Sequence, residues 1–338
     1  MVLFTNVTLR IIMRQKSKEV RMNETAQTRR TLLEQIAEMY YVNGMSQDEI
    51  AVKVSMSRAN ISKLLKTCVR EKIVEFKINY SISPRAALAR AIEERFGLKK
   101  ALVVPSDSRE ELSKNNVGNE ASAYLESVLV SGMLIGVSWG TTLYHVVNNL
   151  HPKKTVRADV IQMVGGISAK SVDTDGQDLA KKMAHALNGK CYIMQVPMIV
   201  QSRVLKDLLM EEPNVAEHFK MFERIDMAVV GLGSNRAEFS AIFKSGNITR
   251  EDTESITSLG AVGNLCGRHI DINGNLYTSS ISDKVIGIEL QQLKKIETVI
   301  GVAVGFEKTE AALGSLRGGY IDVLIIDENL AHGILNAE

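Results

Sequence analysis

The sequence predicts an α/β protein: an N-terminal all-α helix-turn-helix domain, followed by a larger Rossmann-like, mostly parallel α/β domain. Two observations lead to this prediction. Residues 45–75 have the apolar spacing of two short helices separated by a tight turn. From residue 101 onward, apolar runs rich in β-branched residues alternate with helical segments. A chain of 338 residues is long enough for both domains to bury their own cores.

Charge is divided unevenly along the chain. Residues 1–80 hold 14 basic and 8 acidic side chains, whereas the remainder holds 27 basic and 31 acidic ones. A basic N-terminal segment followed by a mildly acidic remainder is typical of a nucleic-acid-binding module attached to another domain. The alternative is that this uneven distribution arose by chance, because a change of a few charged residues would remove it.

Cysteine spacing and hydropathy exclude several classes of protein. Cys68, Cys191 and Cys266 lie too far apart for a zinc site, and their odd number argues against a disulfide framework. No apolar run reaches the roughly 18 residues that span a bilayer. We therefore expect a cytoplasmic protein with no metal and no membrane partner. We interpret residues 1–21 as a disordered tail or a start-codon artefact, with Met22 as the native start.

The N-terminal domain, residues 22–80, is expected to contain three helices. Apolar residues at helical spacing predict the first over about residues 25–42. Ser46 and Glu49 predict a capping box at the start of the second helix. Ser57 is expected to cap the third helix. The apolar residues of this third helix should pack on the other two: Ile61, Leu64, Leu65, Cys68 and Val69.

The opposite face of the third helix is polar and basic, so we predict that it enters a DNA major groove. Arg58 suits guanine and Asn60 suits adenine, whereas Lys63 and Lys66 suit phosphate. The alternative is a three-helix domain with a solvated polar face, and plain exposure explains Gln47 equally well. The predicted DNA-contacting residues are Gln47, Ser57, Arg58, Asn60, Ser62, Lys63 and Lys66.

Residues 73–78 alternate like a strand, and they form either a small wing or the exit from the domain. Pro84 marks the start of the second domain, residues 84–338. The predicted strands of that domain are 101–105, 134–139, 158–165, 191–197, 227–233, 298–305 and 320–327. The helices predicted between them include 119–131, 142–150 and 177–187. This alternation implies a mostly parallel sheet with helices on both faces, which binds ligands at the carboxyl ends of its strands.

Residues 136–142 form the first Gly-rich loop at such a strand end. Its glycines, including Gly140, let the backbone approach an anion, and the hydroxyls of Ser138, Thr141 and Thr142 supply donors. The loop contains no lysine, which argues against a Walker A motif and favours the phosphate of a small metabolite. The alternative is a plain capped turn.

Further polar loops follow other predicted strands. Gly165 and Gly166 end one strand, and Gln177 opens the next helix. Residues 231–234, which include Gly233, resemble part of a dinucleotide fingerprint. They lack its third glycine and its acidic partner, so we reject NAD binding and expect no cofactor.

Two charged residues complete the candidate site. Asp271, in the loop-like region 260–274, is either a turn former or an acceptor for sugar hydroxyls. Lys308, after the strand 298–305, either neutralises a phosphate, or bonds a carbonyl or hydroxyl, or is a surface lysine. His269 is more consistent with a structural role than with a ligand role. We expect no catalytic residue.

Together these segments resemble the SorC family of bacterial sugar-binding transcriptional regulators. The resemblance covers the chain from about Met22 to its end. Its landmarks are SQDEIAVKVSMSRANISKLLK, GVSWGTTL, VGG, VGLGS, GAVGNLCGRHIDINGN and GVAVGFEKTEAALGSLRGGYIDVLIIDENLA. The resemblance implies a helix-turn-helix joined to a domain similar to phosphosugar isomerases and deaminases that binds its ligand without turnover.

By this resemblance Ser138, Gly140, Thr141 and Thr142 hold the effector's phosphate, and the rest of the sugar meets Gln177, Asp271 and Lys308. Two departures follow. Val164 stands where some relatives carry an arginine for a second phosphate, which favours a monophosphate. Some relatives have glutamate where this chain has Asp271, which leaves the preferred sugar or polyol open.

We therefore expect a homo-oligomeric transcription factor, a dimer or tetramer, that binds operator DNA and a phosphorylated sugar or polyol effector. One rival is a phosphosugar isomerase or deaminase with an accessory head, in which Asp271 or Glu307 acts as base. Another is a constitutive DNA-binding structural protein, which would show no ligand response.

Overall fold

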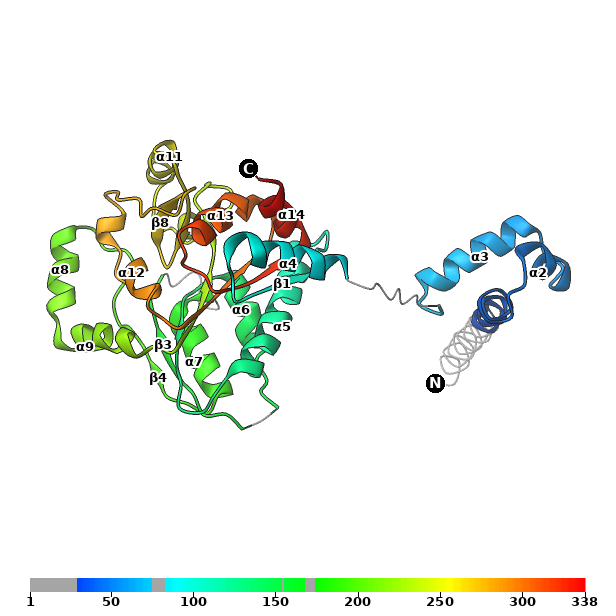
Figure 1. Ribbon diagram of the computed structural model, residues 1–338, viewed down its shortest axis with the longest axis horizontal. Coiled ribbons are helices and arrows are strands. Elements are labelled where there is room, and N and C mark those ends of the chain that lie inside the picture. Colours follow the sequence, from blue (N-terminus) through cyan, green and yellow to red (C-terminus); the bar gives the residue numbers. More distant parts are fainter. Residues whose placement is uncertain (1–28, 75–82, 154, 168–173, 338) are drawn as a thin grey trace, which may run out of the picture. The chain divides into compact units, whose positions relative to one another are not determined.

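The computed structural model describes residues 29–74, 83–153, 155–167 and 174–337. The chain divides into two compact units, Met1–Tyr80 and Ser81–Glu338, each described by itself (Figure 1). The expectation for residues 1–21 and most of the strand expected at 73–78 lie outside the described residues. Within the described ranges, no helix combines the length and apolar character needed to cross a bilayer.

The described part of the first unit opens with helical residues 29–37, which continue into a π-helical turn, η1 (Glu38–Val42). Helices α2 (Gln47–Lys53) and α3 (Arg58–Arg70) follow. The predicted capping box of α2 is present, because the Ser46 side chain accepts from the Glu49 N–H and the Glu49 carboxylate accepts from the Ser46 N–H.

The turn between α2 and α3 places Ser55 in the left-handed region, with φ of 55°. Side chains of all three helices meet in small apolar clusters, in which Ile36, Ile50 and Ile61 have no exposed surface. The apolar stripe of α3 is shorter than expected, since Val69 is 41% exposed. Val69 lies one residue before the end of α3, and it is left largely uncovered by the described residues of this unit.

The second unit is built on a seven-stranded sheet in the order β1-β10-β9-β5-β2-β3-β4, with every neighbouring pair parallel. All seven predicted strands are present in it, which confirms the α/β class. In chain order the strands are β1 (Lys100–Val104), β2 (Leu134–Val137), β3 (Asp159–Gln162), β4 (Cys191–Tyr192), β5 (Met227–Gly231), β9 (Thr298–Ala303) and β10 (Val323–Asp327).

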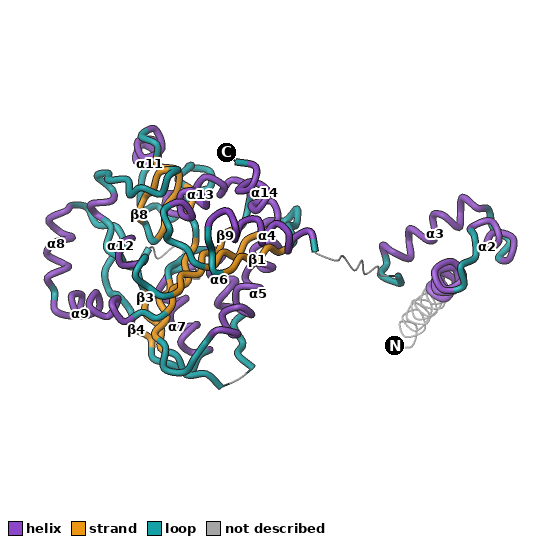
Figure 2. The backbone as a smooth tube through the Cα atoms, in the orientation of Figure 1, coloured by secondary structure: helices purple, strands orange, loops and turns teal. Residues whose placement is uncertain are grey.

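Helices cover both faces of this sheet (Figures 1 and 2). Consecutive strand residues alternate between two cores: Val229 and Ile325 belong to one, whereas Val230 and Ile326 belong to the other. The first core also contains residues of α5 (Glu110–Val128), α6 (Thr141–Asn148) and α7 (Gly176–Ala186). The second contains residues of α4 (Pro84–Phe96), α12 (Leu290–Leu293), α13 (Thr309–Arg317) and α14 (Glu328–Asn336).

Shorter helices occupy the connections between these elements. They are α8 (Arg203–Glu211), α9 (Pro213–Met221), η3 (Phe222–Arg224), α10 (Ala241–Lys244), α11 (Arg250–Ser258), η4 (Ser282–Lys284) and η5 (Phe306–Lys308).

One part of the fold differs from the prediction. Residues 260–274 are not a loop at a strand end but the core of an antiparallel sheet formed by β6 (Gly233–Ser234), β7 (Ala261–Leu265) and β8 (Arg268–Asp271). The two-residue turn between β7 and β8 has φ of 51° at Cys266 and 78° at Gly267, as in a type I′ hairpin.

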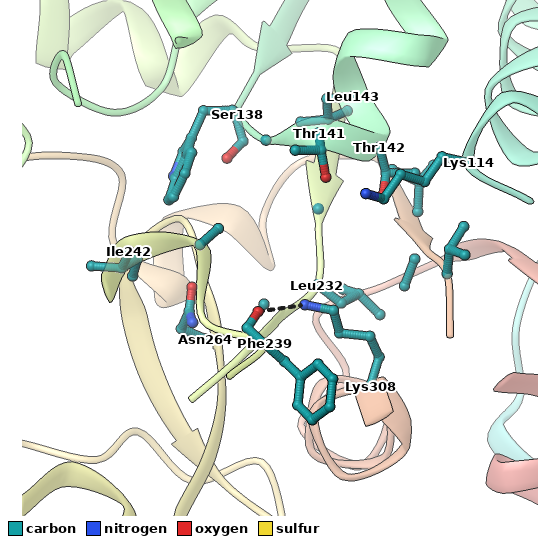
Figure 3. Close-up of a pocket in the computed structure, with 18 of the residues that line it drawn as sticks. Lys114, Ser138, Thr141, Thr142, Leu143, Leu232, Phe239, Ile242, Asn264 and Lys308 are labelled. Carbon is teal, nitrogen blue, oxygen red and sulfur yellow. Dashed lines mark hydrogen bonds between the residues drawn. The ribbon is translucent and has the colours of Figure 1, made fainter. Parts of the chain in front are cut away.

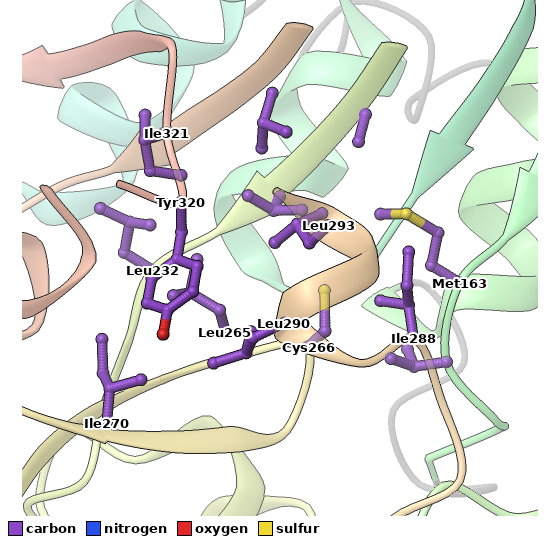
Figure 4. Packing of buried hydrophobic residues seen from close by; sticks show 14 of the residues in the cluster. Met163, Leu232, Leu265, Cys266, Ile270, Ile288, Leu290, Leu293, Tyr320 and Ile321 are labelled. Carbon is purple, nitrogen blue, oxygen red and sulfur yellow. The ribbon is translucent and has the colours of Figure 1, made fainter. Parts of the chain in front are cut away.

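This hairpin is anchored by apolar packing and by one buried arginine. Leu265 and Ile270 enter the same core as Leu290 and Leu293 (Figure 4). Arg268 is 3% exposed. Its guanidinium donates to four backbone carbonyls, those of Ser282, Val285, Gly287 and Ile288, and pairs with the Glu289 carboxylate at 2.7 Å. The hairpin is thereby fixed beside the carboxyl ends of the main strands.

Candidate functional site

A cavity of about 160 Å³ lies where β2, β5 and β9 end. Ligands of parallel α/β sheets bind at this edge because loops and helix N-termini converge there. The predicted site residues that line the cavity are Ser138, Gly140, Thr141, Thr142, Gly233 and Lys308. These residues come from three separate segments of the chain, which the fold brings together.

The loop between β2 and α6 forms one wall of this cavity (Figure 3). Gly140 precedes α6 with φ of 126°, a conformation that favours glycine. Its N–H donates to the Thr174 carbonyl at 3.1 Å, so this amide is already bound. Gly140 therefore shapes the loop, and the groups at this wall that could donate to an anion are the first-turn N–H groups of α6 and the Thr141 and Thr142 hydroxyls.

Lys308, at the end of η5, forms part of the opposite wall. Its ammonium donates to the Phe239 carbonyl at 3.4 Å (Figure 3). Burial lowers the pKa of Lys308 to about 8, with the nearby Glu307 carboxylate opposing that shift. The cavity thus holds a cation opposite a helix N-terminus, an arrangement suited to an anionic ligand.

Lys114 is a second cavity cation, which sequence reasoning missed. It lies on α5 with 9% exposure and pairs with Glu110 at 2.8 Å and with Glu111 at 2.9 Å. Burial works against its charge, but the hydrogen bonds that its ammonium donates to both carboxylates prevail and raise the pKa of Lys114. The predicted helix 119–131 begins nine residues after the start of α5 at Glu110, so the prediction leaves Lys114 outside the helix.

Asn264 is another missed residue. It lies on β7, lines the cavity and is 6% exposed. In Figure 3 it lies across the cavity from Ser138 and Thr141. The sequence offered a signal, a polar residue within GAVGNLCG, but we interpreted that region as a loop.

Four predicted effector residues do not line this cavity. Gly165 and Gly166 donate their N–H groups to the carbonyls of Ile286 and Val196, in tight packing where a Cβ on Gly165 would lie 2.6 Å from Pro197. The Gln177 amide donates to the Met194 carbonyl at 3.4 Å. The Asp271 carboxylate accepts from the backbone of Asn273 and from the backbone and side chain of Asn275. Asp271 therefore has the turn-forming role, because β8 carries it away from the cavity.

Cys266 contributes a thiol to the cavity lining. Burial raises the pKa of this thiol to about 11, so it is protonated at neutral pH. A protonated, buried thiol is a poor nucleophile and acts here as a small apolar group.

The predicted DNA-contacting residues lie on the surface of the first unit. Arg58, Asn60, Lys63 and Lys66 are exposed along α3, and Gln47 and Ser62 are half-buried. Ser57 caps α3 by accepting from the Asn60 N–H at 3.3 Å. The Arg58 guanidinium lies 3.7 Å from the Asp48 carboxylate, and both side chains are about 70% exposed. This pair is weak and leaves Arg58 available to another partner.

Comparisons with known proteins identify relatives of both units. Residues 80–336 match the Sugar-bind family, described as a sugar-binding domain. The deoxyribonucleoside regulator of Bacillus subtilis strain 168 is 30% identical over 301 residues, covering 89% of this chain and 96% of the relative. The sorbitol operon regulator of Klebsiella pneumoniae is 30% identical over 319 residues, covering 90% and 97%.

Solved structures agree with these sequence relationships. The crystal structure of the full-length sorbitol operon regulator SorC from Klebsiella pneumoniae matches with a TM-score of 0.72 and 28% identity. The match covers 90% of this chain and 98% of that chain, so it includes regions on both sides of residue 80.

Proposed function

Because this chain belongs to the SorC family of sugar-binding transcriptional regulators, we propose that a phosphorylated sugar or polyol in its cavity controls its binding to operator DNA. The family membership establishes a transcriptional regulator with a sugar-binding domain. The phosphate, the oligomeric state and the cytoplasmic location are part of the proposal.

The convergence of the α6 N-terminus and Lys308 on one cavity is the observation that carries this proposal. Free N–H groups at a helix N-terminus attract an anion, and the hydroxyls of Thr141 and Thr142 add donors beside them. Lys308 supplies a positive charge from the facing wall. If the phosphate group binds at the α6 N-terminus, the polyhydroxylated part of a small ligand extends across the cavity towards Lys308 and Asn264.

The residue at position 164 supports a monophosphate over a bisphosphate. Val164 is fully buried and forms a bridge with Gly287. It supplies no charge for a second phosphate. Lys114 is nearby, but Glu110 and Glu111 already neutralise it.

Control of DNA binding follows from linkage between the two sites. A ligand that binds one arrangement of a homo-oligomer more tightly shifts the population towards that arrangement. We propose a dimer or tetramer, in which the shift changes the spacing of paired α3 helices on two operator half-sites. The family relationship supports binding without turnover. In the rival isomerase, Glu307 would be the candidate base, because Glu110, the other carboxylate that lines the cavity, is paired with Lys114.

One experiment tests the proposal directly. An operator is first selected with the purified protein from a random-sequence DNA pool, and its complex is titrated with sorbitol 6-phosphate, erythritol 4-phosphate, 2-deoxyribose 5-phosphate and the matching unphosphorylated compounds. We expect at least one phosphate ester to change operator affinity, with no effect of its unphosphorylated partner and no turnover. A response to none of the esters, or catalytic conversion at a rate of about 1 s⁻¹ or more, contradicts the proposal.

A further inference from the structure

Helix α8 carries an apolar face that the described residues of the second unit leave uncovered. Val204 is 68% exposed, Leu205 is 40% exposed and Leu208 is 58% exposed. Spacings of one, three and four residues place these side chains along one side of the helix. The helix lies at the periphery of the unit, away from the seven-stranded sheet (Figure 1). Large apolar side chains that adjoin one another on a surface helix, instead of lying scattered, mark an interaction site.

Another side of α8 packs on its own unit. Leu209 and Met210 contact the core that also contains α12. The Arg203 guanidinium lies 3.8 Å from the Asp283 carboxylate. No residue of the helix is fully buried, however. A helix of this length gains little stability from its own hydrogen bonds and depends on packing. Within the described part of the unit, the packing of α8 is therefore only half complete.

The charges of α8 are arranged against its own dipole. Basic Arg203 and Lys206 lie in its first half, whereas Glu211 ends the helix and Glu212 follows it. A helix is stabilised by acidic side chains at its N-terminus and by basic ones at its C-terminus. The first turn of α8 has no acidic residue and its last turn has no basic one. This arrangement costs the isolated helix stability, but it suits a neighbouring helix that runs in the opposite direction.

A second α8 in the antiparallel direction matches both the apolar face and the charges. Two-fold symmetry brings the two apolar faces together, with Val204 of each helix opposite Leu208 of the other. The same symmetry places Arg203 of each helix beside Glu211 of the other. Arg203 is 66% exposed, and its ion pair with Asp207 at 3.5 Å is a weak surface pair, so its guanidinium can reach a new carboxylate. The α8 face is thus complementary to itself.

We propose that the α8 faces of two copies of this chain pack antiparallel across a two-fold axis. The inference rests on the homo-oligomer of the proposed function and specifies one of its interfaces. A nine-residue helix is only about 14 Å long. Two such helices bury less than the roughly 1,200 Å² of a stable interface. The α8 contact therefore acts together with other contacts in the assembly.

The first test measures self-association of the full-length protein by sedimentation velocity over a range of concentrations. Leu208→Asp places a charge within the apolar face, so it should weaken self-association by about tenfold or more. Leu259→Asp is the matched control, because Leu259 is 61% exposed at the end of α11, and it should associate like the wild type. Both variants should keep the circular dichroism of the wild type, since the replaced side chains are exposed.

An exchange of charges tests the antiparallel direction. Arg203→Glu and Glu211→Arg each place like charges at both ends of the helix pair, so each variant alone should associate several-fold more weakly than the wild type. An equimolar mixture restores opposite charges at both ends and should form mixed oligomers with about the wild-type affinity. A fluorescent label on one variant identifies these oligomers during sedimentation. An unrelated contact predicts no gain on mixing, and a parallel pair predicts single variants no weaker than the wild type.

The outcomes are separable. A wild type that stays monomeric at all concentrations overturns the homo-oligomer of the proposed function, and this inference with it. A wild type that self-associates, with Leu208→Asp doing so equally well, overturns this inference alone and assigns the α8 face to a different protein or to another part of the same chain. Equal weakening in Leu208→Asp and Leu259→Asp also overturns it, as does a mixture of the charge variants that associates no better than its components.

Discussion

Gly233 lies directly against the side chain of Asn264, as its partner in the β6–β7 pair. A Cβ at position 233 would lie 2.7 Å from both polar atoms of the Asn264 amide. Contacts this short force the side chain to move, and the oxygen that faces the cavity would move with it.

Gly233→Ala should therefore weaken binding of the preferred sugar or polyol phosphate several-fold and destabilise the second unit by about 1–3 kcal/mol, the usual range for overpacking. Calorimetric titration and urea unfolding measure the two effects. Gly231→Ala is the matched control for the unfolding measurement, because its Cβ would meet its nearest neighbour, the Trp139 carbonyl, at an ordinary 3.5 Å. Equal losses of stability in the two variants would contradict the proposed crowding of Asn264.

Thr141→Glu should abolish the effector response and leave operator affinity unchanged. The new carboxylate would lie at the α6 N-terminus, where it occupies the anion position and repels a phosphate. Thr141→Ser retains the hydroxyl and should respond like the wild type. Fluorescence anisotropy of labelled operator DNA, with and without ligand, measures both properties, and a normal response in Thr141→Glu would remove the phosphate from this loop.

Arg58→Ala and Asn60→Ala should each weaken specific operator binding by about 1–3 kcal/mol if the side chain contacts a base. Lys66→Ala should instead weaken specific and non-specific DNA alike and reduce the salt dependence of binding. Gel-shift titrations at several salt concentrations distinguish these patterns. Unchanged operator affinity in both the Arg58 and Asn60 variants would mean that another face of α3 meets the DNA.

Effector affinity should decrease as pH rises through about 8. Burial lowers the pKa of Lys308 to about 8, so its charge is complete below that pH and is lost above it. We expect affinity to fall by up to about tenfold between pH 8 and pH 9, one proton per binding event. Lys308→Arg keeps its charge and should bind equally at both pH values. Effector affinity is titrated at several pH values for both proteins. Identical pH profiles for the wild type and Lys308→Arg would contradict the role of Lys308.

The second unit should lose stability as pH falls from about 6.5 towards 4. His269 has a pKa of about 4 when folded, below its ordinary 6.5. In this window the unfolded chain binds a proton that the folded chain does not. The loss contributed by His269 approaches about 3 kcal/mol by pH 4. His269→Asn keeps a donor near the Nδ1 position without titrating, and it should show a smaller loss in urea unfolding followed by circular dichroism.

The sequence predicted the parallel sheet well because buried parallel strands are continuous apolar runs. The predicted strand 320–327, for example, contains all of β10. The β6–β7–β8 sheet was missed because its strands are shaped by close packing. Gly263 lies where a Cβ would meet the Ala311 side chain at 2.4 Å, and no local pattern reveals such a neighbour.

The candidate site shows the same division. Ser138, Thr141 and Thr142 were found because glycine and hydroxyl residues at a strand end form a local pattern. Asn264 was missed because tertiary structure alone turns it to the cavity. For Asp271 the sequence left two roles open, turn former and ligand acceptor, and β8 directs its carboxylate into the turn at residues 273–275. Sequence motifs indicate which segments contribute to the site, whereas the tertiary structure determines what each side chain contacts.

Trp139 is the single tryptophan of the chain, and it lines the cavity beside Gly140. Its indole is only partly buried, packed against the core on one side. Intrinsic emission of the protein therefore originates next to the ligand position, without background from a second indole. Quenching or a wavelength change on adding a metabolite would report occupancy in unlabelled protein, in the presence of operator DNA and in real time.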